Sequence, residues 1–255
     1  MRKKLIAGNW KMNLDIHQAS ALLHRLEENV ETHRDVEVVI CPGLLDIQPL
    51  NRQINHHKMK LGAQDAYFED EGAFTGEVSA YQLHDLVEYV IVGHSERRHV
   101  MGETDDIVSK KLAAVVRNKI KPILCVGETS GDRSAGETKQ VLHDQIMTDL
   151  LNLTSKEVQD LVIAYEPVWA IGTGDYASPD QVKEAIDFIR HNAHELYGNK
   201  AEASMRVLYG GSVNADNARS YLDVEGVDGL LVGGASLNYK EFAKIVASVH
   251  QDAED

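Results

Sequence analysis

The sequence predicts an α/β protein folded as a single (β/α)8 barrel that spans residues 1–255. Eight short apolar runs alternate with longer amphipathic segments along the whole chain. Most of the runs are nearly continuous in Val, Ile and Leu, which is typical of parallel strands covered on both faces. A length of 255 residues suits eight strand–helix repeats, and no Ser/Pro-rich linker or break in composition divides the chain.

The expected strands follow one another at regular intervals. They are the runs "KLIAGNWK" (4–11), "VEVVICPG" (36–43), "KLGAQDA" (60–66), "YVIVGHS" (89–95), "KPILCVGE" (121–128), "LVIAYEP" (161–167), "MRVLYGG" (205–211) and "GLLVGGAS" (229–236).

The segments between the strands carry apolar residues three or four positions apart, as amphipathic helices do. Residues 178–198 give the clearest case, because Ser178 can cap a helix, Pro179 can occupy its first turn and Gly198 can end it. Similar stripes predict helices near the start of the chain (Leu22, Leu23, Leu26, Val30) and near its end (Phe242, Ile245, Val246, Val249). An open doubly wound sheet is the alternative, but its first turn would carry a glycine-rich fingerprint, and here that turn reads "GNWKMN".

The chain is acidic, with 26 Lys and Arg against 40 Asp and Glu and a formal net charge of −14. This charge disfavours nucleic acid and anionic membranes as partners. Cys41 and Cys125 both lie in apolar runs, which predicts buried thiols rather than a disulfide, and no Cys–His metal-ligand spacing is present. The first apolar stretch is too short for a signal peptide, and no run approaches the ~20 residues of a membrane helix, so we expect a cytoplasmic protein.

Residues that can carry chemistry follow the expected strands at their carboxyl ends. They are Asn9 and Lys11 after the first strand, His94 after the fourth, Glu166 after the sixth, Gly210, Gly211 and Ser212 after the seventh, and Gly233 and Gly234 after the eighth. Because the carboxyl ends of barrel strands surround one mouth, the fold would gather these residues from distant parts of the sequence.

Three of these side chains suggest distinct roles. Glu166 follows an apolar strand and precedes Pro167, so we expect a fixed, partly desolvated carboxylate that acts as a base. A helical turn that begins at Ser95 would keep the His94 imidazole neutral, and a neutral imidazole can donate a hydrogen bond to a developing oxyanion. Lys11 lies in an apolar context and would supply the positive charge that an anionic substrate needs.

The glycine pairs after the last two strands predict a phosphate site, because backbone N–H groups without a neighbouring Cβ can approach phosphate oxygens closely. Residues 167–177 predict a lid, since this segment has a rigid start, glycines at its far end and the apolar side chains of Trp169 and Ile171 between them.

These residues belong to motifs that resemble the triosephosphate isomerase family. The matching motifs are "AGNWKMN" (7–13), "GAFTGEVSA" (72–80), "VGHSERR" (92–98), "CVGE" (125–128), "AYEPVWAIGTG" (164–174), "YGGSV" (209–213) and "LVGGASL" (231–237). They cover nearly the whole chain in family order. The resemblance implies a TIM barrel and the reversible conversion of dihydroxyacetone phosphate to D-glyceraldehyde 3-phosphate, with no metal or organic cofactor.

The resemblance also implies roles for individual residues, in which two side chains with differently shifted pKa values divide the acid–base work. Glu166 would move a proton between neighbouring carbons, and His94 would transfer protons between the two oxygens of an enediolate. Asn9 and Lys11 would stabilise the oxyanion, and Glu96 would position Lys11. Backbone N–H groups would bind the substrate phosphate, from Gly172, Ser212, Gly233 and Gly234.

The family is usually a homodimer, in which the loop corresponding to 66–78, with Thr75, braces the partner's active site. Two places depart from the family pattern: 127–136, where many members are more acidic, and Asp65, where Asn is common. Two other functions remain open at this point. A barrel aldolase could use Lys11 to form a Schiff base, and a protein on the same scaffold could bind phosphates without turnover.

Overall fold

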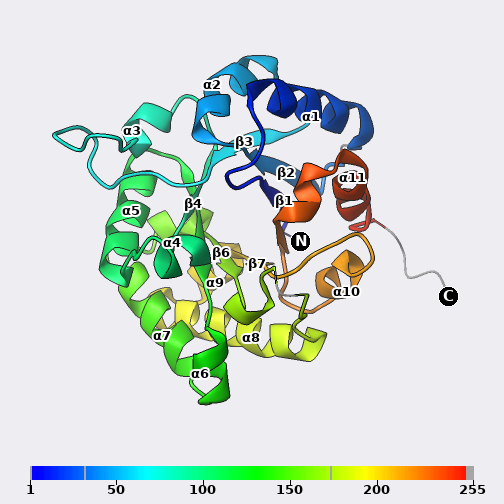
Figure 1. The fold of residues 1–255 in the computed structure, drawn as a ribbon. Coiled ribbons are helices and arrows are strands. Elements are labelled where there is room, and N and C mark those ends of the chain that lie inside the picture. The colour runs from blue at the N-terminus through cyan, green and yellow to red at the C-terminus, as the bar shows by residue number, and fades with distance from the viewer. Residues whose placement is uncertain (1, 32, 173, 251–255) are drawn as a thin grey trace.

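Eight parallel strands pair in sequence order, and the last pairs with the first to close a barrel (Figure 1). The computed structural model describes residues 2–31, 33–172 and 174–250, so residues 1, 32, 173 and 251–255 of the expected domain lie outside the described ranges. The strands are β1 Lys4–Asn9, β2 Val36–Cys41, β3 Lys60–Ala63, β4 Tyr89–Val92, β5 Lys121–Val126, β6 Val162–Tyr165, β7 Arg206–Tyr209 and β8 Gly229–Val232. Each strand lies inside the run predicted for it, so the predicted barrel is confirmed.

Helices surround the barrel on its outside (Figure 1). The α-helices are α1 Ile16–Asn29, α2 Leu44–Gln53, α3 Ala80–Leu83, α4 Ser95–His99, α5 Asp105–Arg117, α6 Ser130–Ser134, α7 Thr138–Asp149, α8 Pro179–Tyr197, α9 Asn199–Ser204, α10 Ala218–Leu222 and α11 Tyr239–Ala247. Short 3₁₀ turns are η1 Glu157–Asp160, η2 Val168–Ala170 and η3 Gly234–Leu237. Helix α8 begins and ends as predicted, because the Ser178 side chain accepts the Gln181 N–H and Gly198 adopts a φ of 75° at the end.

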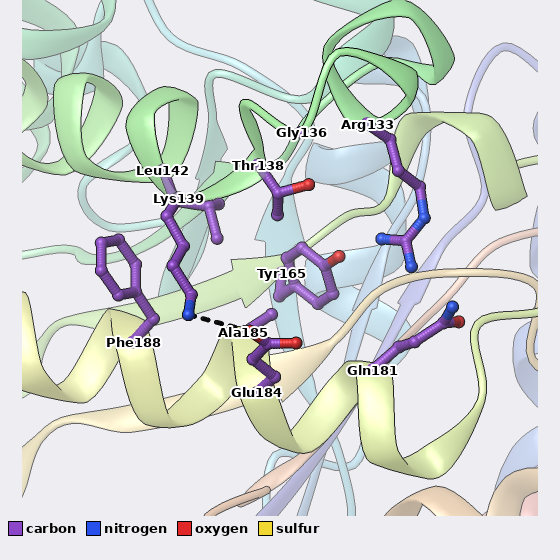
Figure 2. A pocket seen from close by; sticks show the side chains of 10 residues that line it. All are labelled: Arg133, Gly136, Thr138, Lys139, Leu142, Tyr165, Gln181, Glu184, Ala185 and Phe188. Atoms are coloured by element: carbon purple, nitrogen blue, oxygen red, sulfur yellow. Dashed lines mark ion pairs between the residues drawn. The ribbon is translucent and has the colours of Figure 1, made fainter.

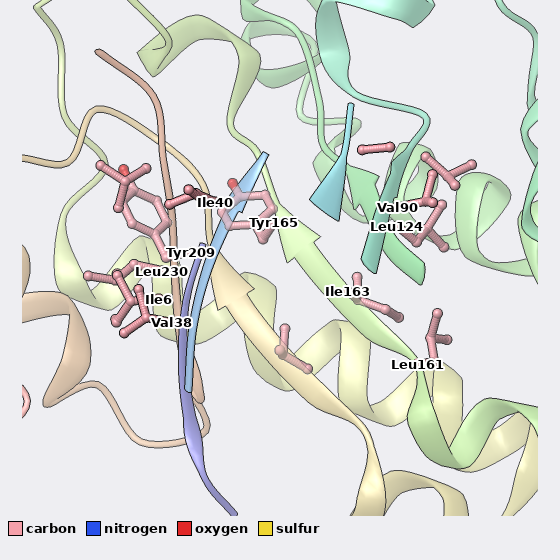
Figure 3. Close-up of a cluster of buried hydrophobic side chains, with 14 of the residues drawn as sticks. Ile6, Val38, Ile40, Val90, Leu124, Leu161, Ile163, Tyr165, Tyr209 and Leu230 are labelled. Atoms are coloured by element: carbon pink, nitrogen blue, oxygen red, sulfur yellow. The ribbon is translucent and has the colours of Figure 1, made fainter. Parts of the chain in front are cut away.

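The core has two layers, because successive side chains of a barrel strand point alternately inward and outward. Leu5 and Ala7 of β1 belong to the cluster that fills the barrel, together with the free thiols Cys41 and Cys125. Ile6, between them, belongs to the larger cluster that joins the strands to the helices (Figure 3). Burial raises the pKa of the Cys41 thiol to about 12, so this cysteine stays protonated and serves as an apolar side chain.

None of the helices in the described ranges combines the length and apolar character that crossing a membrane requires. The same ranges contain no group of three or more His, Cys, Asp or Glu side chains arranged to hold a metal ion.

Candidate active site

Four of the predicted side chains meet at the carboxyl-end mouth of the barrel. The His94 ring nitrogen Nε2 lies 3.0 Å from Glu166 Oε1, and Lys11 Nζ lies 2.6 Å from Glu96 Oε1. The second oxygen of Glu96 lies 3.7 Å from His94 Nδ1, so the Lys11–Glu96 pair lies beside the His94–Glu166 pair. They come from three separate segments of the sequence, and the barrel brings those segments together.

Glu166 directly follows β6 and is only 2% exposed. Its oxygen Oε2 accepts the backbone N–H of Ser95 at 3.0 Å, and its own N–H donates to the Val126 carbonyl at 2.8 Å. Two glycines leave room for it: a Cβ on Gly127 would lie 1.8 Å from the Glu166 carbonyl oxygen, and a Cβ on Gly210 would lie 3.0 Å from Glu166 Cγ. The two hydrogen bonds and the close packing of the two glycines therefore fix the position of Glu166.

The environment of Glu166 differs from the sequence expectation in one respect. Burial raises the pKa of this carboxyl, as expected, but the charge and hydrogen bond of His94 and the N–H of Ser95 lower it more. The net pKa is lower than the ordinary value, so the carboxylate is ionised in this arrangement. The sequence could not show this, because the stabilising groups lie about 70 residues away.

His94 is the residue that caps helix α4, and a helical turn does begin directly after it. Its Nδ1 accepts the backbone N–H of Glu96 at 3.2 Å, which in a neutral imidazole assigns the ring proton to Nε2, facing Glu166. Burial lowers the pKa of His94, whereas the Glu166 carboxylate raises it, and the net direction is upward. Burial and Glu166 therefore act on the pKa of this ring in opposite directions, and the net rise differs from the lowering expected of a helix N-terminus.

Lys11 is held in a left-handed backbone conformation with φ of 53°, which is uncommon for a residue with a side chain. Asn9 Oδ1 accepts the Lys11 N–H at 3.0 Å, and Gln64 Nε2 donates to the carbonyls of Lys11 (2.8 Å) and Cys41 (3.0 Å). The sequence reading missed Gln64. The one feature that could have indicated a role for it is its place, as a polar residue, at the carboxyl end of the third predicted strand.

The predicted phosphate residues are only partly brought together. A Cβ on Gly233 would lie 3.7 Å from Lys11 Cε, which places this glycine beside the lysine, and nothing would lie within 4 Å of one on Gly234. The Ser212 hydroxyl donates to the Ala170 carbonyl at 2.5 Å, so the loop after β7 contacts the predicted lid. Gly172 has a φ of 70°, and a Cβ built on it would meet no described atom within 4 Å.

The predicted lid, 167–177, is anchored at its start, and its residue 173 lies outside the described ranges. Trp169 Nε1 donates to Glu128 Oε1 at 2.9 Å, and the Tyr165 hydroxyl donates to the same carboxylate. The Arg133 guanidinium lies 3.1 Å from Glu128 and 4.6 Å from the centre of the Trp169 ring. Glu128 is fully buried and was missed by the sequence reading, although it ends the motif "CVGE".

Asp65, which departs from the family pattern, belongs to a charged cluster at the side of the mouth. Its carboxylate lies 2.7 Å from Lys111 Nζ and 3.0 Å from Arg97 Nε, and Glu103 contacts the same two cations. Burial raises the pKa of Asp65, and the two cations oppose this rise only in part. Asp65 therefore ties β3 to the residues that follow His94.

Fold and site together define a (β/α)8-barrel protein with acid–base side chains and a lysine at the mouth formed by the carboxyl ends of its strands. A family model described as "Triosephosphate isomerase" matches residues 4–249. The triosephosphate isomerase of Moorella thermoacetica is 47% identical over 96% of this chain and 98% of its own length. Those of Alkaliphilus metalliredigens and Clostridium tetani are each 44% identical over 96% of this chain, and over 99% and 96% of their own lengths. The chain belongs to the triosephosphate isomerase family, which confirms the resemblance seen in its motifs.

Proposed function

We propose that this chain is a triosephosphate isomerase, which interconverts dihydroxyacetone phosphate and D-glyceraldehyde 3-phosphate through an enediolate without a cofactor. Family membership supports the overall reaction. The observation that carries the mechanism is the 3.0 Å contact between Glu166 and His94 at the mouth of the barrel. This contact sets a base and a hydrogen-bond donor side by side, which is the pair that a proton transfer beside a carbonyl needs.

Glu166 is the base in this proposal. It removes a proton from the carbon next to the carbonyl and returns it to the neighbouring carbon. To reach the substrate, the carboxylate gives up its contacts with Ser95 and His94, which lower its pKa. The raising effect of burial then remains, so the pKa of Glu166 rises as the substrate takes their place, and the carboxylate becomes a stronger base.

His94 is the electrophile. Its Nε2 proton, which faces Glu166, would instead be donated to the substrate oxygens as negative charge develops on them. Asn9 and the Lys11 ammonium add donors on the same side of the mouth. Fixed donors of this kind commonly supply the largest share of the stabilisation of an oxyanion.

Lys11 and backbone N–H groups would hold the phosphate. These groups belong to Gly172, Ser212, Gly233 and Gly234, and the position of Gly233 beside Lys11 supports this assignment. Glu96 would fix the direction of Lys11 through their 2.6 Å ion pair. The lid 167–177 would exclude water from the enediolate, which would otherwise lose its phosphate.

The variant Glu166→Gln tests the base assignment, because it keeps the shape of the side chain and removes its basicity. We expect turnover to be lost while inorganic phosphate and glycerol 3-phosphate still bind. Glu195→Gln, an exposed change on α8, is the matched control and should keep full activity. An equal loss of binding and turnover in Glu166→Gln would contradict the role. Lys11→Met should weaken phosphate binding and turnover together.

The aldolase alternative is disfavoured by the Lys11–Glu96 ion pair, because a Schiff base requires an uncharged amine. Borohydride reduction in the presence of dihydroxyacetone phosphate would trap a covalent adduct of an aldolase, and we expect none. A protein that only binds phosphates would show no turnover in an isomerase assay, so this measurement also decides against the second alternative.

We propose further that the protein is a homodimer formed through the loop around Thr75. This loop projects beyond β3 and α3 (Figure 1), and several large apolar side chains of the described residues are exposed. Exposed fractions reach 98% for Met12, 90% for Leu45 and 73% for Val100, which is typical of a covered interface. Sedimentation of the wild type should give twice the chain mass, and Thr75→Arg should give the single chain. The unpaired, buried thiols support a cytoplasmic location.

A further inference from the structure

A second hollow lies outside the barrel, between helices α7 and α8 and beneath α6 (Figure 2). Its volume is about 380 Å³, which falls within the usual size range of small-molecule sites. Its α6 side comes from the segment 127–136, where the sequence departs from the family pattern. No residue assigned to the isomerase reaction lines it.

The hollow has one polar wall made of hydrogen-bond donors. Arg133 uses one nitrogen, Nη1, for Glu128 and stacks on the Trp169 ring, and within the described ranges its Nε and Nη2 donate no hydrogen bond. Gln181 Oε1 accepts the backbone N–H of Ser178 at 2.9 Å, which turns the NH2 group of Gln181 toward the hollow. In Figure 2 the Arg133 guanidinium and the Gln181 amide face each other, and the Thr138 hydroxyl points into the space near them.

The opposite wall is apolar, formed by Leu142, Ala185 and Phe188 (Figure 2). The remaining charges at the rim are already paired, since Lys139 Nζ lies 2.9 Å from Glu184 Oε1. The hollow therefore has hydrogen-bond donors without acceptors at one end and apolar side chains at the other. A planar guanidinium can donate two parallel hydrogen bonds to the two oxygens of a carboxylate. Such a charged pair binds more strongly than a guanidinium does to a single neutral acceptor.

We propose that this hollow binds a small amphipathic monocarboxylate, with its carboxylate on Arg133, Gln181 and Thr138 and its apolar part on the opposite wall. The site is separate from the isomerase mouth. Because Arg133 also holds Glu128 and covers the Trp169 ring, an occupant contacts the residue that joins the hollow to the start of the lid.

The test is calorimetric titration of the full chain with 3-phenylpropionate, with inorganic phosphate at saturation to occupy the isomerase mouth. We expect one saturable site per chain, and binding of the neutral 3-phenylpropionamide at least about tenfold weaker, since the amide lacks the charge that Arg133 recognises. Equal binding of acid and amide would overturn the proposal. An affinity for the acid that falls as the phosphate concentration is raised further would also overturn it. So would the lack of saturable binding up to about 10 mM, where a site of this size and chemistry should fill.

Two variants locate the site. Gln181→Glu keeps the oxygen that caps α8 but puts a negative charge beside the bound carboxylate, so affinity should fall at least about tenfold. Thr138→Val removes one donor at constant shape and should weaken binding by a few fold. Gln140→Glu makes the same charge change at an exposed position of α7 and should leave binding unchanged. All three should keep isomerase turnover, which reports correct folding, and equal losses in Gln140→Glu and Gln181→Glu would refute the location.

Discussion

The substitution Gly127→Ala should damage catalysis although Gly127 bears no functional group. A Cβ at this position would lie 1.8 Å from the carbonyl oxygen of Glu166 and 2.5 Å from its carbonyl carbon. Gly127 cannot move away freely, because its N–H donates to Gln145 Oε1 at 2.8 Å. The strain must therefore displace the backbone of the base.

The size of the displacement follows from the contact distance. A Cβ rarely comes closer than 3.0 Å to such an atom, so the two groups must separate by at least 3.0 − 1.8 = 1.2 Å. A shift of about 1 Å in a catalytic group costs on the order of 10²-fold in rate, or about 2.7 kcal/mol of activation free energy. Overpacking should also lower the free energy of unfolding by about 1–3 kcal/mol.

The assay is steady-state isomerase turnover coupled to a dehydrogenase, with chemical denaturation run in parallel. We expect kcat to fall about a hundredfold while KM changes little, because the phosphate contacts lie elsewhere. Gly131→Ala, four residues further on inside helix α6, is the control, since its Cβ would lie 3.6 Å from Thr129 Oγ1 and would favour the helix. A folded Gly127→Ala protein with kcat within about threefold of wild type would refute the reasoning.

Three further predictions concern stability and the lid. Lys111→Met removes a buried cation from two half-buried carboxylates and should lower the free energy of unfolding by about 3–5 kcal/mol, measured in urea. Trp169→Phe removes the hydrogen bond from the indole to the Glu128 carboxylate, worth about 1.5–3 kcal/mol, so backbone amides of 168–172 should exchange with solvent at least about tenfold faster. Burial raises the pKa of Glu37, but Arg206 lowers it more, to a value below the ordinary 4.5. Its stabilising effect should thus be complete above pH 4.5 and lost as pH falls through the lower folded-state pKa, so the stability curves of Glu37→Gln and wild type should converge in acid.

Each of these three has a result that contradicts it. A free energy of unfolding of Lys111→Met equal to that of the wild type would mean that Lys111 does not stabilise the fold through Asp65 and Glu103. Unchanged exchange in Trp169→Phe would mean that the indole bond does not restrain the lid. Curves for Glu37→Gln and wild type that stay parallel down to low pH would mean that Arg206 does not lower the Glu37 pKa.

Local patterns in the sequence were enough to predict the barrel. Each strand formed within its apolar run because both faces of a parallel strand are buried, which demands several apolar residues in succession. Both ends of α8 were equally predictable, since Ser178, Pro179 and Gly198 act on backbone groups within one helical turn of themselves. The candidate residues could be selected because they follow strands, and the fold places every strand's carboxyl end at the same mouth.

Only the tertiary structure decided how those residues act on one another. The lowered pKa of Glu166 depends on His94 and on the N–H of Ser95, which lies 71 positions away. The need for glycine at 127 depends on the carbonyl of Glu166, and the donors of the second hollow come from three different helices. Hydrophobic periodicity is a property of neighbouring residues, so the sequence shows it directly. Electrostatic shifts and close contacts depend on distances between remote residues, and only the closed barrel fixes those distances.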